Sequence, residues 1–283
     1  MSTILEQTVD RADPAPDFVE AEVRYVVDDG TPPYRYIDWP EMADKDRPPA
    51  YEPRRVKIAN GRSCGESFAL PTHGFTLVER PTAMQDFYDE EEILRVYYPE
   101  TEALIKAESG ARRVIVFDHT VRTADKSRLA ERWVRETVHA VHNDYTERSA
   151  PQRVRDFLPA DEAEEALKRR FGIVQTWRSV APRVESEPLA MCDGKSIPGV
   201  GFIPYQRRYR DRIAETYHLS WSPEHRFYYF PLMTRDEAMV FKVFDTDASA
   251  GVRFTAHTAF DDPTTPPDAA GRESIEMRAL AFY

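Results

Sequence analysis

The series of short β-branched segments in the second half of the chain most constrains the fold. Short apolar runs recur from residue 112 to the C-terminus, and loops with Pro, Asp and Gly separate them with little helix between. Strands that follow one another in this way pair antiparallel and build a sandwich or barrel. The expected strands are 113–119, 137–145, 173–180, 189–192, 214–221, 227–232, 239–244, 251–257 and 274–282. The sequence therefore predicts a mainly β protein.

The first part of the chain has a different pattern. Residues 1–60 are rich in Pro and charge, which is typical of an extended arm that lies over a core. Residues 82–108 carry apolar side chains at spacings of three and four, which predicts a helix that Gly110 ends. Residues 160–170 predict a second helix, ended by Gly172. We expect one domain over residues 1–283, with the arm at 1–60 and the β core at 110–283.

Composition excludes several classes of protein. The chain has 283 residues and a net charge of −11, with 38 Lys and Arg against 49 Asp and Glu, so no broad basic surface for nucleic acid is expected. Its apolar runs are far shorter than the roughly 20 residues that span a bilayer. Cys64 and Cys192 are too few and too distant for a disulfide framework or a thiolate metal site. These features predict a soluble, cytoplasmic globular protein, which is an enzyme if a site can be found. A homodimer through the N-terminal arm is left open.

The triplet His142-Asn143-Asp144 carries the clearest chemical signal. On a strand, residues i and i+2 point to the same face, so the imidazole and the carboxylate converge. A mononuclear non-haem Fe(II) centre uses two His and one carboxylate and leaves its other positions open. The triplet supplies two of these ligands, and a His from a distant strand should supply the third. The alternative is that His142 is a surface residue and Asp144 forms a turn.

Three histidines remain as candidates for the third ligand. The seven in the chain are His73, His119, His139, His142, His218, His225 and His257. His139 should face away from His142 on the same strand, because the offset of three positions between them is odd. His73 and His225 lie in segments that predict loops or turns. His119, His218 and His257 are left.

The last predicted strand opens with Arg272-Glu273-Ser274. Arg272 and Ser274 share one face of it. A guanidinium binds a carboxylate as a bidentate pair, and a buried Arg without such a partner is costly, so an inward Arg272 favours an anionic co-substrate. The alternative is a surface ion pair with Glu273 or Glu276. Arg278 lies at an even offset from Arg272 and is the second candidate for the same role.

The order of these residues resembles the layout of 2-oxoglutarate-dependent oxygenases. That layout has His-x-Asp, a series of strands, a His, and then an Arg with a Ser two residues on, and it favours His257 as the third ligand. The chain also resembles the AsaB-type hydroxylase/desaturase family, which includes gibberellin desaturase-like and CmcJ-type proteins of fungal secondary metabolism. The segments that carry this resemblance are 142–146, 174–178, 188–193, 215–218, 227–231, 257–263 and 272–275.

The resemblance implies a double-stranded β-helix (jelly-roll) core with flanking helices, Fe(II) and O2, and 2-oxoglutarate as co-substrate. It places His142, Asp144 and His257 on the metal and catalytic positions, and Arg272 on the co-substrate position. Thr176 departs from the pattern, since relatives are expected to have Asn before Trp-Arg. Five further residues are candidates for the substrate pocket: Arg122, Trp177, Arg178, His218 and Tyr228. For His218 and Tyr228 the alternative is a core position, and for Arg178 it is an ion pair with Glu185 or Glu187.

The predicted activity is hydroxylation, desaturation or cyclisation of a small metabolite by hydrogen abstraction. One alternative is a cupin-like metal enzyme that does not use 2-oxoglutarate. Another is a non-catalytic accessory subunit of a biosynthetic pathway. A methyltransferase is disfavoured because Gly199-Val200-Gly201 lacks a third Gly and no alternating strand–helix pattern surrounds it.

Overall fold

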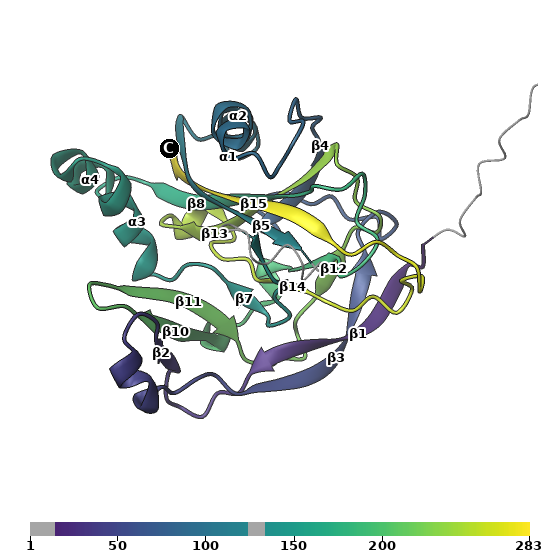
Figure 1. Ribbon diagram of the computed structural model, residues 1–283, viewed down its shortest axis with the longest axis horizontal. Helices are drawn as coiled ribbons and strands as arrows, with labels where there is room; N and C mark the ends of the chain where they lie inside the picture. Colours follow the sequence, from purple (N-terminus) through teal and green to yellow (C-terminus); the bar gives the residue numbers. More distant parts are fainter. Residues whose placement is uncertain (1–14, 124–133) are drawn as a thin grey trace, which may run out of the picture.

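Two β-sheets face each other in the computed structural model, which describes residues 15–123 and 134–283 (Figure 1). The larger sheet has the order β1 (Phe18–Val26), β3 (Tyr51–Asn60), β12 (Phe227–Tyr229), β9 (Leu189–Cys192), β14 (His257–Ala259), β7 (His142–Asn143), β11 (Ile213–Leu219), β10 (Phe202–Arg208) and β2 (Tyr34–Tyr36). The smaller has the order β4 (Phe75–Glu79), β13 (Glu237–Asp245), β8 (Phe171–Ser179), β15 (Glu273–Phe282), β5 (Arg113–Thr123) and β6 (Val134–Arg135). This arrangement confirms the mainly β, jelly-roll fold.

Helices cover the outer face of the smaller sheet (Figure 1). They are α1 (Glu90–Glu92), a π-helical turn (Ile93–Tyr97) and α2 (Tyr98–Ser109). Alternate side chains of β15, such as Ile275 and Met277, pack in one buried cluster with Leu104 and Ile105 of α2. The intervening positions point toward the larger sheet. Because strand side chains alternate, the polar residues Ser274, Glu276 and Arg278 all face the space between the sheets.

The helix predictions are partly confirmed. The helix expected over 82–108 begins only at Glu90, because Asp89 caps its first turn, and it ends before Gly110, whose φ of 72° is left-handed. The second predicted helix is α4 (Ala160–Ala166). Helix α3 (Ser149–Phe157) was not predicted, since its Pro and Arg obscure the apolar face. Short 3-10 turns occur at Pro40–Lys45, Gly194–Ser196, Gly199–Gly201 and Ala248–Ala250. None of the described helices has the length and apolar character needed to cross a membrane.

Two predicted strands differ from the structure by more than a shift of their ends. The strand expected over 137–145 is reduced to β7, because the segment before it bonds to other parts of the chain: Thr137 and His139 contact the Glu187 carboxylate, and Ala140 bridges to β1. The strand expected to end at His257 instead begins there. Both differences leave His142 and His257 on neighbouring strands.

The arm expected over residues 1–60 lies outside the described residues up to residue 14. Its strands β1, β2 and β3 are hydrogen-bonded into the larger sheet, with the 3-10 turn at Pro40–Lys45 between β2 and β3. Strand β1 pairs antiparallel with β3 along its whole length, and β3 pairs with β12. Alternate residues of β1, among them Val19, Val23 and Tyr25, are buried in the core. The surrounding charged residues hide this period-two pattern in the sequence. Strands β1, β2, β3, β4, β6 and β10 were not predicted.

A buried ion-pair cluster stabilises the end of β13. The Lys242 Nζ lies 2.9 Å from the Asp245 carboxylate, which also accepts a 2.8 Å hydrogen bond from Arg170, and both Lys242 and Asp245 are buried. Asp245→Ala leaves the Lys242 cation unpaired in the core, and we expect it to lower the free energy of unfolding by about 3–5 kcal/mol in urea titrations. Glu165→Ala, which removes an exposed carboxylate, serves as the control and should leave stability unchanged.

The same cluster predicts an acid-sensitive contribution to stability. Burial raises the pKa of Asp245, but Arg170 and Lys242 more than offset this and hold the pKa below its usual value. The stabilisation is therefore fully present above the unfolded pKa of about 4 and is lost as pH falls through the lower folded value. The difference in stability between wild type and Asp245→Ala should shrink below about pH 4. A constant difference down to about pH 2 would contradict this assignment.

Candidate metal centre

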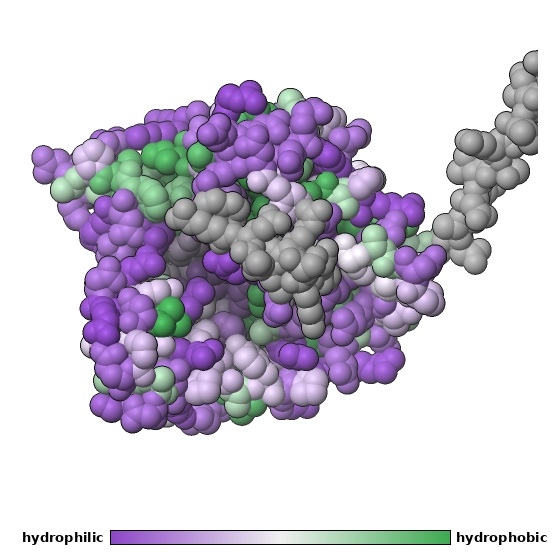
Figure 2. Space-filling model, in the orientation of Figure 1, coloured by the Kyte–Doolittle hydropathy of each residue, from purple (hydrophilic) through white to green (hydrophobic). Residues whose placement is uncertain are grey.

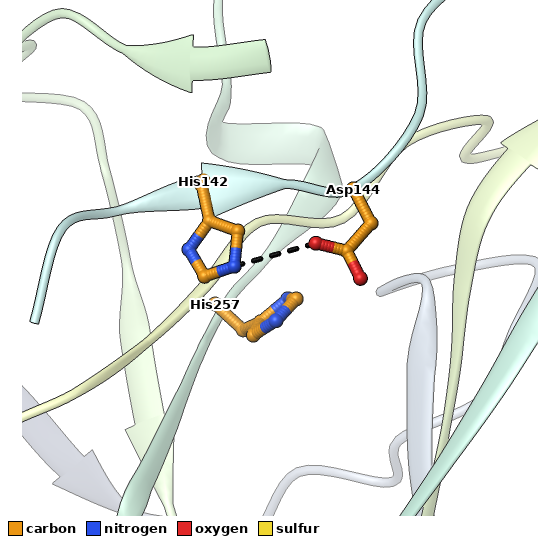
Figure 3. Close-up of side chains that lie close together, drawn as sticks. All are labelled: His142, Asp144 and His257. Atoms are coloured by element: carbon orange, nitrogen blue, oxygen red, sulfur yellow. Dashed lines mark ion pairs between the residues drawn. The ribbon is translucent and has the colours of Figure 1, made fainter. Parts of the chain in front are cut away.

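Three potential metal ligands converge between the sheets. His142 in β7 and His257 in β14 are direct partners across two neighbouring strands, and Asp144 follows two residues after His142. One ligand atom from each of the three lies within 4.8 Å of the others. Figure 3 shows both rings and the carboxylate turned toward a common point. The predicted third ligand is thus brought to the predicted pair.

The hydrogen bonds of His142 fix which nitrogen faces the site. Its Nδ1 lies 2.8 Å from the carbonyl oxygen of Ala140, which can only accept, so Nδ1 carries the proton. In the neutral ring, Nε2 then presents a lone pair toward Asp144 Oδ1, 3.4 Å away. A metal ion, or a proton shared between the two atoms, would satisfy both acceptors. Backbone contacts of this kind also orient the histidine ligands of metals.

His257 is suited to bind a cation as a neutral ligand. It is 3% exposed, and burial, assisted by His142, holds its pKa well below the usual value. Its Nδ1 is buried and has no hydrogen-bond partner within the described part of the chain. A buried ring nitrogen without a partner is costly, and a metal ion would satisfy a histidine in this position.

The Asp144 carboxylate is held so that one oxygen remains available. Its Oδ2 accepts hydrogen bonds from Gln175 Nε2 at 2.7 Å and from Arg278 Nε at 3.1 Å, which leaves Oδ1 on the side of His142. Burial raises the pKa of Asp144, but Arg278 and His142 outweigh burial and hold it well below its usual value. Asp144 is therefore ionised. Two imidazoles and one carboxylate, with room beside them, fit a mononuclear Fe(II) centre.

Arg278 is already hydrogen-bonded to several side chains of this protein. Besides Asp144 it contacts the Glu276 carboxylate and donates hydrogen bonds to Asp118 at 3.0 Å and to Thr120 at 2.9 Å. Burial lowers the pKa of Arg278, whereas Glu276 and Asp144 raise it well above the usual value. The guanidinium therefore stays charged and holds the Asp144 carboxylate in place.

Arg272 and Ser274 have unused hydrogen-bonding capacity. Both are buried, and within the described residues neither Arg272 Nε nor Ser274 Oγ has a partner. The Arg272 Nη1 donates to the Glu187 carbonyl oxygen at 2.8 Å, and its guanidinium lies 5.7 Å from the Trp177 ring centroid. Burial, with Arg122 nearby, lowers the pKa of Arg272 to about 10. A buried cation without a carboxylate partner has the chemistry of an anion-binding site.

A cavity of about 500 Å³ opens beside the metal centre. His142, Asp144, Arg122 and His218 line it, and Figure 2 shows this face of the molecule hollowed between α3 and the β10–β11 hairpin. His218 lies opposite His142 in β11, and its Nδ1 is 2.9 Å from the Tyr51 hydroxyl. Burial lowers the pKa of His218 to about 3, so the ring is neutral. The structure thus brings Arg122 and His218 to the cavity.

Other predicted pocket residues lie elsewhere. Trp177 faces the space between the sheets beneath Arg272, but Arg178, the next residue, points to the outer face, where it donates to the Tyr97 hydroxyl at 3.0 Å. Tyr228 packs in an aromatic cluster with Phe68 and Phe75, away from the cavity lining. The structure does not bring Arg178 or Tyr228 to the metal centre. Thr176 also faces outward, so the departure there leaves the cavity wall unchanged.

Two other histidines, His119 and His139, lie away from the metal centre. His119 lies 3.1 Å from the Tyr98 hydroxyl under the helical layer. His139 forms a second group with Glu187 and Asp261, in agreement with its opposite orientation from His142.

Gln175 and Glu276 also lie at the site, but they were not among the predicted site residues. Gln175 occurs two residues before Trp177 on one strand, so the period-two rule could have found it.

Comparison with known proteins gives a consistent set of relatives. A family model described as "Oxidoreductase/YMDC permease-like domain" matches residues 23–282. The chain is 31% identical over 256 residues to a hydroxylase/desaturase (efuI) of Hormonema carpetanum, covering 82% of this chain and 85% of the relative. It is 30% identical over 239 residues to an Fe(II)/2-oxoglutarate-dependent dioxygenase (nvfI) of Aspergillus novofumigatus, covering 82% and 84%.

A solved structure has the same fold. The iron and alpha-ketoglutarate-dependent endoperoxidase NvfI superposes with a TM-score of 0.82 and 28% identity, over 94% of this chain and 98% of that one. The likeness therefore spans nearly the whole chain.

Proposed function

This chain belongs to the oxidoreductase family whose fungal members are Fe(II)/2-oxoglutarate-dependent hydroxylases, desaturases and dioxygenases, and we propose which of its residues perform the reaction. The protein is an oxygenase that uses Fe(II), O2 and 2-oxoglutarate to oxidise a small molecule. In our proposal His142, Asp144 and His257 bind the metal. Arg272 and Ser274 bind the distal carboxylate of 2-oxoglutarate.

The observation that supports this proposal is the presence of two binding sites that each lack a ligand. One is a group of three ligand atoms within 4.8 Å. The other consists of the buried Arg272 guanidinium and the Ser274 hydroxyl, whose Nε and Oγ have no hydrogen-bond partner among the described residues. Both lie on the inner faces of facing sheets. A 2-oxo acid has one end that chelates a metal and another that needs a cationic partner. It would therefore complete both sites at once.

Each residue has a distinct task in the reaction. When bound, the iron supplies activation of O2 at the expense of 2-oxoglutarate and abstraction of a substrate hydrogen. The backbone carbonyl at Ala140 keeps the proton on Nδ1 of His142, so that Nε2 faces the metal. Gln175 and Arg278 hold Asp144 ionised and oriented. Arg272 fixes the carboxylate end of the co-substrate, and the low exposure around it excludes competing water.

Oxygen consumption tests the activity directly. We expect the iron-loaded protein to take up O2 slowly when 2-oxoglutarate is present, to release succinate and CO2, and to do neither without 2-oxoglutarate. Uptake that does not depend on 2-oxoglutarate would instead support a cupin-like metal enzyme. A folded, iron-loaded protein with no uptake, even in the presence of candidate metabolites, would support an accessory role.

Arg278 should act as a positioning residue for the metal. Replacing it with Gln removes the cation that holds Asp144, and we expect Fe(II) affinity to fall about 10- to 100-fold in anaerobic calorimetry. Arg278→Lys keeps the charge and should recover part of the loss, whereas a purely structural role would show no such rescue. Circular dichroism checks that each variant is folded. Unchanged Fe(II) affinity in a folded Arg278→Gln protein would contradict the assignment.

The single domain over residues 1–283 and the homodimer stay predictions. The two sheets share one buried cluster, which favours the single domain. Sedimentation of the purified chain would decide the oligomeric state.

A further inference from the structure

The cavity beside the metal centre is more positive than the chain that forms it. Among the described residues, six arginines and three carboxylates line it, although the whole chain has a net charge of −11. The arginines are Arg122, Arg135, Arg153, Arg207, Arg212 and Arg278, and the carboxylates are Asp118, Asp144 and Glu215. An excess of cations in a cavity attracts an anionic ligand.

The three carboxylates already accept hydrogen bonds from other residues of the protein. Asp118 and Asp144 accept hydrogen bonds from Arg278. Glu215 accepts from two neutral donors, the Thr146 hydroxyl at 2.7 Å and the Gln206 amide at 3.0 Å. Of the described residues, none forms an ion pair with Arg207 or Arg212.

Arg207 and Arg212 stand on the β10–β11 hairpin at the exposed side of the cavity. The guanidinium of Arg212 lies 4.5 Å from the Tyr209 ring centroid, which holds it in a defined place. Arg207 shares its face with Tyr205, whose ring packs edge-on against His218 at 5.1 Å. Both cations therefore line the same cavity as His142, together with the rings of Tyr205 and Tyr209.

The register of the sheet gives the separation, measured along the backbone, between the position of Arg207 and that of His142. Arg207 lies opposite Ala214 of β11, and His218, four residues further along β11, lies opposite His142. At about 3.3 Å per residue, this separation is about 13 Å along the strand. Ala214, Thr216 and His218 all line the cavity, so they form its floor between the two points. Decanoate has a comparable length.

We propose that the substrate is an organic acid about as long as decanoate, whose carboxylate binds Arg207 and Arg212 while its far end lies at the metal centre. This inference rests on the proposed function and adds to it the chemical class and the direction of the substrate. The co-substrate carboxylate binds elsewhere, at Arg272, so the two anions do not compete.

Decanoate and decanamide are the matched probes. Each is titrated by calorimetry into protein loaded with Mn(II) and saturating 2-oxoglutarate, so that the co-substrate site is filled. We expect decanoate to bind about tenfold more tightly than decanamide, and R207Q/R212Q to remove this preference without changing 2-oxoglutarate binding. R55Q/R169Q removes two exposed surface charges and should keep the preference. Equal affinities in wild type, or a preference retained in R207Q/R212Q, would overturn the proposal.

The direction of binding is tested by the paramagnetism of Mn(II). Relative to a Zn(II)-loaded sample, the terminal methyl protons of decanoate should broaden more than the protons next to its carboxylate. The reverse order would place the carboxylate at the metal and overturn the proposal. Absence of Mn(II) binding would overturn the proposed function and this inference with it. Absence of acid-over-amide preference, with Mn(II) and 2-oxoglutarate bound, would overturn this inference alone.

Discussion

Replacing Asp144 with alanine is expected to remove Fe(II) binding and with it all oxygen consumption that depends on 2-oxoglutarate. The substitution deletes the only anionic member of the ligand group and leaves two neutral imidazoles. It also leaves the Arg278 cation beside the centre without one of its counter-charges, and this cation would repel Fe(II). The loss of affinity should exceed the roughly 100-fold that removal of an outer hydrogen-bond partner costs. Competition against a coloured Fe(II) chelator under anaerobic conditions measures it.

Asp118→Ala is the matched control for this experiment. Asp118 is also a carboxylate partner of Arg278, 3.0 Å away, but its side chain is 55% exposed and it is not in the ligand group. It should retain Fe(II) affinity close to that of wild type. A folded Asp144→Ala protein that binds Fe(II) as wild type does would show that the metal is held elsewhere.

Replacing Arg272 with glutamine is expected to raise the 2-oxoglutarate concentration needed for half-maximal oxygen uptake about 10- to 100-fold. The glutamine amide keeps hydrogen-bonding capacity but removes the charge and the bidentate geometry that match a carboxylate. Fe(II) affinity should stay unchanged, since Arg272 is not in the ligand group. Steady-state uptake at several 2-oxoglutarate concentrations, with iron content measured in parallel, separates the two effects.

Arg183→Gln provides the comparison, because it removes an exposed arginine that pairs with Glu185 on the surface. It should leave the 2-oxoglutarate requirement unchanged. Ser274→Ala should raise the requirement by less than Arg272→Gln, since it removes a single neutral hydroxyl. An unchanged requirement in a folded Arg272→Gln protein would transfer the role to another cation, with Arg122 the nearest candidate.

The convergence of His142 and Asp144 was predictable because it depends on a short sequence distance and simple periodicity. The spacing of His142 and Asp144 places both on one side of the chain even though β7 itself is only two residues long. The partnership of His257 with His142 required the family resemblance, because sheet order is set by long-range pairing. Spacing along the sequence does not report which distant strands become neighbours.

The substrate pocket was harder to predict for the same reason. Trp177 and Arg178 are consecutive in β8, so at most one of them can face the space between the sheets, and the sequence does not say which. The structure turns Trp177 inward and Arg178 toward Tyr97. Arg207 and Arg212 escaped notice because the strand β10 was not predicted. The hairpin that places them at the cavity therefore remained hidden.

An anaerobic titration of the purified protein with Fe(II) and 2-oxoglutarate is the most direct test of whether this chain binds both at one centre. A 2-oxo acid that chelates Fe(II) in such a centre gives a weak visible charge-transfer band. We predict that wild type develops this band at one equivalent of each, and that Asp144→Ala and Arg272→Ala both fail to develop it at the same concentrations. A folded, iron-loaded wild type without the band would contradict the account, as would variants that keep it.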